Sequence, residues 1–186
     1  MKHTNISQDI IDIAKEKADA MGIINNSITS GKGSTHGFLG EIIVSNFLGA
    51  TIENTYDYDL RLQSFTIDVK TKRVNTPPRP NYECSIAAFN TKQACNFYVF
   101  TRILNNMGEG WILGYLPKEE YFDRAVFLKK GETDPSNGVE CYICFMGWKL
   151  VLFWWKCLCT PNLTSNVFYY HCYFCRCRTA RSTVVI

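Results

Sequence analysis

FTIDVKTK, residues 65–72, is the stretch of sequence that decides the fold. Its apolar and β-branched side chains occupy every second position, and Asp68, Lys70 and Lys72 occupy the positions between them. Side chains of a strand alternate between its two faces, so this pattern predicts a strand with one buried face and one charged face.

The residues just before this strand predict its partner. DLRLQ, residues 59–63, alternates in the same way, and a turn is expected at Gln63 and Ser64, where this run meets the next. A two-residue turn there makes a β-hairpin whose register places Leu60 opposite Ile67 and Asp59 opposite Asp68.

Two facing aspartates need a neutralising partner. Directly opposed side chains have β-carbons about 4.5 to 5.5 Å apart, and like charges at that distance destabilise a sheet. A cation between Asp59 and Asp68 would remove the repulsion, with Lys70 roughly 6.6 Å further along the same face. Carboxylates without nearby His or Cys suit Mg²⁺ or Mn²⁺. The open alternative is a surface charge ladder, in which one of the acids pairs with Lys70 or Arg61.

A third carboxylate lies on a helix predicted over HGFLGEIIVSNFLGA, residues 36–50. Apolar side chains cover nearly the whole circumference of this helix, which is typical of a buried helix. Glu41 therefore needs a partner, and completing the cation site with Asp59 and Asp68 would provide one. The alternative is that Glu41 reaches solvent or a backbone donor.

The remaining pattern predicts an α/β (α+β) domain with a central mixed β-sheet flanked by helices. An amphipathic helix is expected over residues 7–20, and a loop over NNSITSGKGST that lacks a complete phosphate-binding motif. Two strands are expected in CNFYVFTRI and GWILGYL, joined as a hairpin by NNMGE, and PKEEYFDRA is expected to start a helix.

Length and composition fit one globular domain, with 186 residues, 46% hydrophobic residues and a net charge of +3. This charge permits a nucleic-acid partner without requiring one. The first 17 residues contain no long apolar run after Lys2, so we expect a cytoplasmic protein without a secretory signal.

The chain changes character near Asn137. Residues 1–137 hold 15 basic and 16 acidic side chains, whereas residues 138–186 hold 5 basic and 1 acidic. We therefore divide the chain into a domain over 1–137 and an atypical tail over 138–186. The tail carries seven of the nine cysteines, namely Cys141, Cys144, Cys157, Cys159, Cys172, Cys175 and Cys177.

The tail allows three interpretations. Its closely spaced thiols could form a Zn²⁺ site. A membrane helix over CYICFMGWKLVLFWWKCLC is disfavoured by Lys149 and Lys156, so no membrane partner is expected. The interpretation we favour is a coding sequence read in a displaced frame, because acid content, cysteine use and periodicity all change together.

The hairpin and the buried helix together resemble the PD-(D/E)XK nucleases, the restriction-endonuclease-like superfamily, and most closely its small phage-type members. The matching residues are Glu41 in the helix, Asp59 in YDYDLRL, and Asp68, Val69 and Lys70 in FTIDVKTKR. Tyr58 stands where the motif's leading proline would be. The resemblance extends more loosely over residues 36–135, and it implies a restriction-endonuclease-like core.

This resemblance implies Mg²⁺-dependent hydrolysis of phosphodiester bonds in DNA. Asp59, Asp68 and the main-chain carbonyl of Val69 would bind the metal, Glu41 would contribute directly or through water, and Lys70 would orient the attacking water or stabilise the pentavalent state. Lys72, Arg73 and Arg79 could hold the DNA backbone.

Within this family, we expect a structure-selective or nonspecific endonuclease of a phage or mobile element that acts in the cytoplasm of a bacterial cell or a phage-infected host. Holliday-junction resolution by a homodimer is a variant of this expectation. The alternative is a non-catalytic nucleic-acid-binding protein, either a decayed nuclease or a zinc module centred on the tail.

Overall fold

The computed structural model describes residues 1–21, 35–79, 82–132 and 140–145. The chain divides into two compact units, Met1–Val151 and Leu152–Ile186, and every described residue lies in the first. Residues 25–34 of the polar loop expected over residues 25–35 and the cysteines from Cys157 onward therefore lie outside the described residues, whereas Thr35 begins a helix. The displaced-frame hypothesis also concerns mainly that part of the chain.

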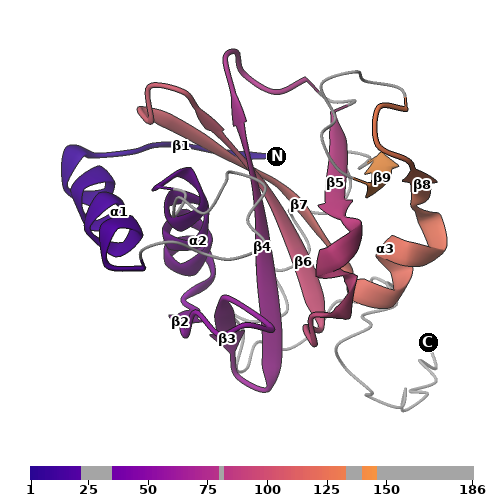
Figure 1. The fold of residues 1–186 in the computed structure, drawn as a ribbon. Coiled ribbons are helices and arrows are strands. Elements are labelled where there is room, and N and C mark those ends of the chain that lie inside the picture. Colours follow the sequence, from indigo (N-terminus) through magenta and orange to yellow (C-terminus); the bar gives the residue numbers. More distant parts are fainter. Residues whose placement is uncertain (22–34, 80–81, 133–139, 146–186) are drawn as a thin grey trace, which may run out of the picture. The chain divides into compact units, whose positions relative to one another are not determined.

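The described residues form a mixed α+β structure built on a six-stranded sheet with the strand order β1-β7-β6-β4-β3-β2 (Figure 1). Only the central pair, β4 and β6, is parallel, and the other neighbours in this sheet are antiparallel. The predicted mixed sheet is thus confirmed. Its strands are β1 (Lys2–Asn5), β2 (Thr51–Ile52), β3 (Leu60–Leu62), β4 (Phe65–Val74), β6 (Phe97–Leu104) and β7 (Glu109–Pro117).

The predicted hairpin is present with the predicted register. β3 and β4 are antiparallel, with Leu60 opposite Ile67 and Leu62 opposite Phe65. Gln63 has a φ of 54°, a left-handed conformation that closes the two-residue turn. The second predicted hairpin is also present, as the antiparallel pair β6 and β7.

Both long helices occur where the periodicity predicts them. α1 spans Gln8–Met21 and α2 spans Thr35–Leu48, and they pack against each other beside β4 (Figure 1). As expected for a buried helix, six of the seven residues from Phe38 to Val44 in α2 are buried, and Glu41 is the exception. Its carboxylate is therefore carried into the interior by apolar neighbours.

Gly40 sets the spacing between α2 and the sheet. A β-carbon at this position would lie 1.9 Å from Thr71 Oγ1 and 2.7 Å from Thr101 Oγ1. These two hydroxyls are joined by a hydrogen bond of 2.8 Å across β4 and β6. The absence of a side chain at residue 40 thus brings the helix backbone close to β4, and Glu41 with it.

The opposite face of the sheet is covered by a second sheet that the sequence pattern did not predict. Its order is β5-β9-β8, with β5 at Glu83–Ala87, β8 at Val126–Leu128 and β9 at Cys141–Phe145. The helix α3 (Lys118–Arg124) supplies Tyr121, whose ring stacks on Phe100 of β6 at 5.5 Å. Phe100 and Thr101 are adjacent in β6, so α3 and α2 lie on opposite faces.

The strand β9 falls within the atypical tail. Cys141 and Cys144 are buried in this strand, and the residue opposite Cys144 is Cys84 of β5. The hydroxyl of Tyr121 lies 2.9 Å from the carbonyl of Cys84 and 2.8 Å from that of Tyr142, so it links β5 with β9. Among the residues that the structure describes, none belongs to a helix long and apolar enough to cross a membrane.

Candidate functional site

The candidate site lies where the pairing between β3 and β4 ends. The ladder ends at Leu60, whereas β4 continues from Ile67 to Val74 with β6 on its other side. Asp59 occupies this end: its main-chain N–H donates to the carbonyl of Ile67 at 3.0 Å, and its carboxylate Oδ2 accepts from the N–H of Val69 at 2.6 Å. The carboxylate therefore takes the place of a strand partner for Val69.

This geometry refines the expected contact between the two aspartates. The register of the hairpin is as predicted, yet Asp59 precedes the strand, so it does not pair with Asp68 across the ladder. Its carboxylate turns toward the edge of β4, and only one of its oxygens is used by the bond to Val69. The N–H and C=O of a strand residue point to the same side, so the Val69 carbonyl faces this edge too.

Asp68 and Lys70 form a buried ion pair. Asp68 is only 2% exposed, and its Oδ2 lies 2.5 Å from Lys70 Nζ, although the contact lacks the geometry of a hydrogen bond. Lys70 also donates to Gln93 Oε1 at 2.9 Å, and its ammonium lies 5.9 Å from the centre of the Tyr98 ring. The pairing of Asp68 with Lys70 that the charge-ladder alternative expected is present, but it is buried and not on the surface, and Arg61 instead pairs with Glu53 at 2.7 Å.

Glu41 approaches the same place from α2. Its Oε2 is buried and has no hydrogen-bond partner among the described residues. Burial raises the pKa of Glu41 to about 8, the charge of Lys17 opposes this shift, and the charge of Asp68 adds to it. A buried carboxyl oxygen without a donor is costly, so this side chain is arranged to receive either a proton or a cation.

The pKa of Asp59 is also raised well above its ordinary range, first by burial and then by the charges of Asp68 and Glu41. Three carboxyl groups therefore act on one another, and the positive charges that offset them are those of Lys17 and Lys70 at Glu41 and that of Lys70 at Asp59. The excess of negative charge is one that a divalent cation would relieve.

A closed metal-binding cluster is not present in the described part of the chain: it contains no group of three or more His, Cys, Asp or Glu side chains arranged to hold an ion. The carboxyl groups nevertheless fit a hard cation by their chemistry, because they offer oxygen ligands only. The unpartnered Oε2 of Glu41 fits one as well.

The structure brings together some of the basic residues expected at the substrate, and separates others. Lys72 is exposed and shares the charged face of β4 with Asp68 and Lys70. Arg73 is exposed on the other face. Burial lowers the pKa of His36, and the charge of Arg73 lowers it further. Arg79 is exposed in the loop that follows β4. Only Lys72 therefore continues the line of Asp68 and Lys70.

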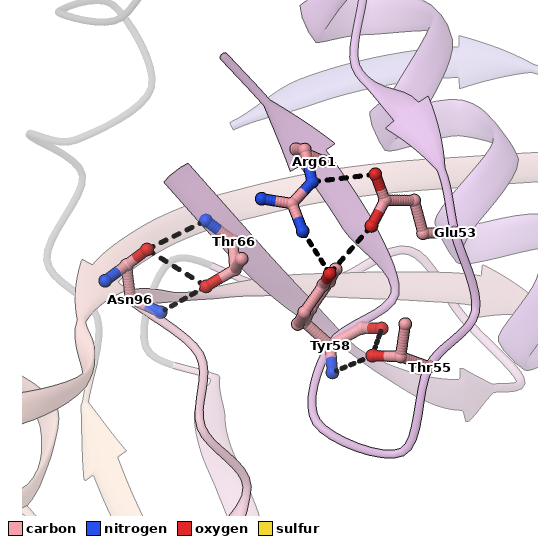
Figure 2. A network of polar contacts seen from close by, with 6 residues as sticks. All are labelled: Glu53, Thr55, Tyr58, Arg61, Thr66 and Asn96. Carbon is pink, nitrogen blue, oxygen red and sulfur yellow. Dashed lines mark hydrogen bonds and ion pairs between the residues drawn. The ribbon is translucent and has the colours of Figure 1, made fainter. Parts of the chain in front are cut away.

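A polar network braces the loop that carries Asp59 (Figure 2). Glu53 accepts from Arg61 Nε and from the Tyr58 hydroxyl, both at 2.7 Å, and Arg61 also donates to that hydroxyl. Thr55 Oγ1 accepts from the N–H of Tyr58 at 3.0 Å and donates to its carbonyl at 2.8 Å. Tyr58 thus fixes the loop by hydrogen bonds.

Asn96 makes a second brace, also seen in Figure 2. Its Oδ1 accepts from both the N–H and the hydroxyl of Thr66, at 2.8 and 2.9 Å. Sequence reasoning missed this clamp and the contact of Gln93 with Lys70. The only available signal was the polar run TKQACN before an apolar strand, which does not identify individual contacts.

Comparison of the chain with protein-family models finds no matching family, and comparison with curated proteins finds no match.

Proposed function

We propose that the chain is a metal-dependent DNA endonuclease with a restriction-endonuclease-like core. The observation that carries this proposal is the electrostatic interaction of Glu41, Asp59 and Asp68, with Lys70 paired to Asp68, where β4 continues without β3. A buried helix, a loop and a strand each contribute an acid, and the strand also contributes the lysine. This combination suits phosphodiester hydrolysis, which needs a cation near the phosphate and a base or donor near the attacking water.

The proposed metal is Mg²⁺ or Mn²⁺, held by the carboxylates of Glu41, Asp59 and Asp68 and by the carbonyl of Val69. The bond from the Val69 N–H leaves the second oxygen of Asp59 for this purpose. When bound, such an ion supplies Lewis-acid stabilisation of the charge that builds on the phosphate oxygens. The raised pKa values of Glu41 and Asp59 support the site, because carboxyl groups that repel one another gain most from a shared cation.

Lys70 would act beside the metal, on the attacking water or on the phosphate. Its side chain is 17% exposed and is held beside Asp68, so it is oriented and still partly accessible. It would orient the attacking water or donate a hydrogen bond to the phosphate as negative charge develops there.

The DNA backbone would be held mainly by exposed basic side chains. Lys72 lies on the same face as Lys70, and Arg73 and Arg79 extend the basic surface beyond it. Contacts of this kind give affinity and salt dependence but no base specificity. The proposal therefore favours a nonspecific or structure-selective enzyme. We propose that it belongs to a phage or mobile element and acts on DNA in the cytoplasm, and that a variant of this function is carried out by a homodimer.

The test is cleavage of supercoiled plasmid by the full chain with Mg²⁺, with Mn²⁺ and with EDTA. Asp68→Asn and Lys70→Met should each lower the cleavage rate by a factor of about 100 or more, because each removes a charge from the reacting centre. Asp12→Asn and Lys15→Met are matched controls, since these residues form an exposed ion pair on α1 at 3.4 Å.

Three results would contradict the proposal: cleavage that persists in EDTA, equal activity of Asp68→Asn and Asp12→Asn, or no cleavage with either metal. DNA binding without cleavage in the unmodified chain would instead support the alternative of a non-catalytic nucleic-acid-binding protein.

A further inference from the structure

We propose that Gln93 is a positioning residue for Lys70: its side-chain amide holds the lysine beside Asp68 and ties it to the loop that carries Asp59. The inference rests on the proposed function and adds to it a residue outside the acids and the lysine. It follows from two hydrogen bonds, in which Gln93 Oε1 accepts from Lys70 Nζ at 2.9 Å and Gln93 Nε2 donates to the carbonyl of Tyr56 at 3.0 Å.

The two partners determine which way the amide points. A main-chain carbonyl can only accept a hydrogen bond, so the NH₂ end of Gln93 must face Tyr56. The oxygen end then faces Lys70, whose ammonium can only donate. Both ends of the amide are therefore matched, and the reversed orientation would leave two donors facing each other and two acceptors facing each other.

The backbone around Gln93 is itself held in place. The carbonyl of Gln93 accepts from Lys118 Nζ, and its N–H donates to the carbonyl of Asn90 at 3.3 Å. The next residue, Ala94, donates its N–H to Asp57 Oδ1 at 3.0 Å. Two hydrogen bonds, each between a side chain and a main-chain group, thus join the segment containing Gln93 to the segment containing Tyr56 and Asp57.

This connection links the two halves of the proposed centre. The segment that includes Tyr56 and Asp57 leads directly into Asp59, which caps the edge of β4 at Val69. The side chain of Gln93 connects this segment, through the carbonyl of Tyr56, to Lys70. A shift of this segment would therefore move an acid and the lysine together, and their separation would be preserved.

A lysine needs such support because its side chain is long and has many rotamers. Asp68 alone would fix one contact, and Gln93 provides a second, in a different direction. Reacting groups must be held within about 0.5 Å for full activity, and a misplacement of about 1 Å can cost on the order of 100-fold in rate. Loss of the second contact should therefore affect the rate of reaction and leave DNA binding unchanged.

The experiment compares Gln93→Leu with the unmodified chain, and uses Gln8→Leu as a matched control. Gln8 is an exposed glutamine on α1 whose amide donates to Asp12 at 2.8 Å, so it represents a similar loss at a different place. Single-turnover cleavage of plasmid with the protein in saturating excess gives the rate constant, and DNA binding in EDTA gives the Kd. The ¹³Cε signal of Lys70, assigned from its disappearance in Lys70→Arg, reports the lysine directly.

Gln93→Leu should lower the rate constant about tenfold or more with a Kd within about twofold, since positioning acts on the reaction step. The Lys70 signal should move toward those of exposed lysines while the other lysine signals stay in place. Gln8→Leu should change none of these.

Two outcomes would overturn the inference. The first is an unchanged rate constant in Gln93→Leu. The second is a lower rate with an unmoved Lys70 signal, which would assign the effect to the loop alone. If the unmodified chain does not cleave DNA, the proposed function fails, and the Lys70 signal still decides whether Gln93 holds this lysine.

Discussion

The carboxylate of Asp59 accepts a hydrogen bond of 2.6 Å from the main-chain N–H of Val69, at the first point where β4 continues without β3. The same side chain thus closes the end of a hairpin and contributes to an acidic centre. These two roles need different chemical properties, because closing the hairpin needs only an acceptor oxygen, whereas binding a cation needs charge.

Substitution of Asp59 should separate these roles. Asp59→Asn keeps an oxygen that can accept from Val69, so the free energy of unfolding should change little in EDTA, while metal-dependent stabilisation is lost. Asp59→Ala removes the acceptor and should lower the free energy of unfolding by about 1 to 3 kcal/mol. Urea denaturation with and without Mg²⁺ measures both effects. Equal stability of the two variants in EDTA would show that the bond to Val69 contributes nothing.

The contact of α2 with β4 predicts that Gly40→Ala is destabilising. The added methyl group would meet Thr71 Oγ1 at 1.9 Å, so the helix or the strand must shift, at a cost of about 1 to 3 kcal/mol. Gly40→Ala combined with Thr71→Ala should recover part of this loss. Gly108→Ala is the control, because a β-carbon there would have its nearest neighbour at 3.6 Å. Thermal denaturation of the four proteins checks this, and equal loss in the two single glycine variants would exclude the close approach as the cause.

The raised pKa of Glu41 predicts how stability depends on pH. Its ordinary pKa of 4.5 becomes about 8 in the folded chain, so the folded state holds a proton that the unfolded state has lost between these values. The contribution of Glu41 to stability is therefore complete below pH 4.5 and declines as pH rises to about 8. Glu41→Gln should remove this decline, as measured by unfolding in EDTA from pH 5 to 9. Parallel pH profiles of the two proteins would contradict the prediction.

Divalent cations should reverse this trend, because protons and cations compete for the same carboxyl groups. At pH 7 the binding of Mg²⁺ should release protons, and its stabilising effect should grow as pH rises toward 8. Calorimetry in two buffers with different ionisation enthalpies measures the number of protons released. The same titration of Glu41→Gln should show fewer protons released. A titration without proton release would argue against Glu41 as part of the cation site.

Tyr121→Phe tests whether β9 belongs to the folded unit. The Tyr121 hydroxyl is near two main-chain carbonyls, one in β5 and one in β9, and its loss should lower the free energy of unfolding by about 1 to 2 kcal/mol. Hydrogen exchange should become faster in both strands. Tyr115→Phe is a comparison variant in β7, outside the contact between β5 and β9. Faster exchange in β5 with none in β9 would contradict the pairing of the two strands.

The elements that the sequence predicted are those with a clear period. The hairpin of β3 and β4 follows from two alternating runs and a polar turn, and α2 follows from an apolar surface all round. Glu41 was found by the same reasoning, as the acid that does not suit its helix. Local patterns suffice in these cases because the information lies within one element or between neighbours in sequence.

The second sheet was not predicted because its information is not local. β8 has only three residues, and β5 pairs with β9, more than 50 positions further along the chain. β1 pairs with β7 although KHTN has no alternating pattern. The contact of Gln93 with Lys70 was likewise invisible, because it depends on how two irregular segments meet.

Gly40 also has a consequence for how this chain could vary. The neighbouring acid reaches the sheet only because position 40 offers no atoms that would hold the helix away. A larger residue there would move the carboxyl group of Glu41 away from the sheet. Glutamate is already the longest acidic amino acid, so no substitution at residue 41 could make up the distance. Changes at these two adjacent positions should therefore be coupled, so that tolerance of bulk at the first is gained only when the second is no longer required.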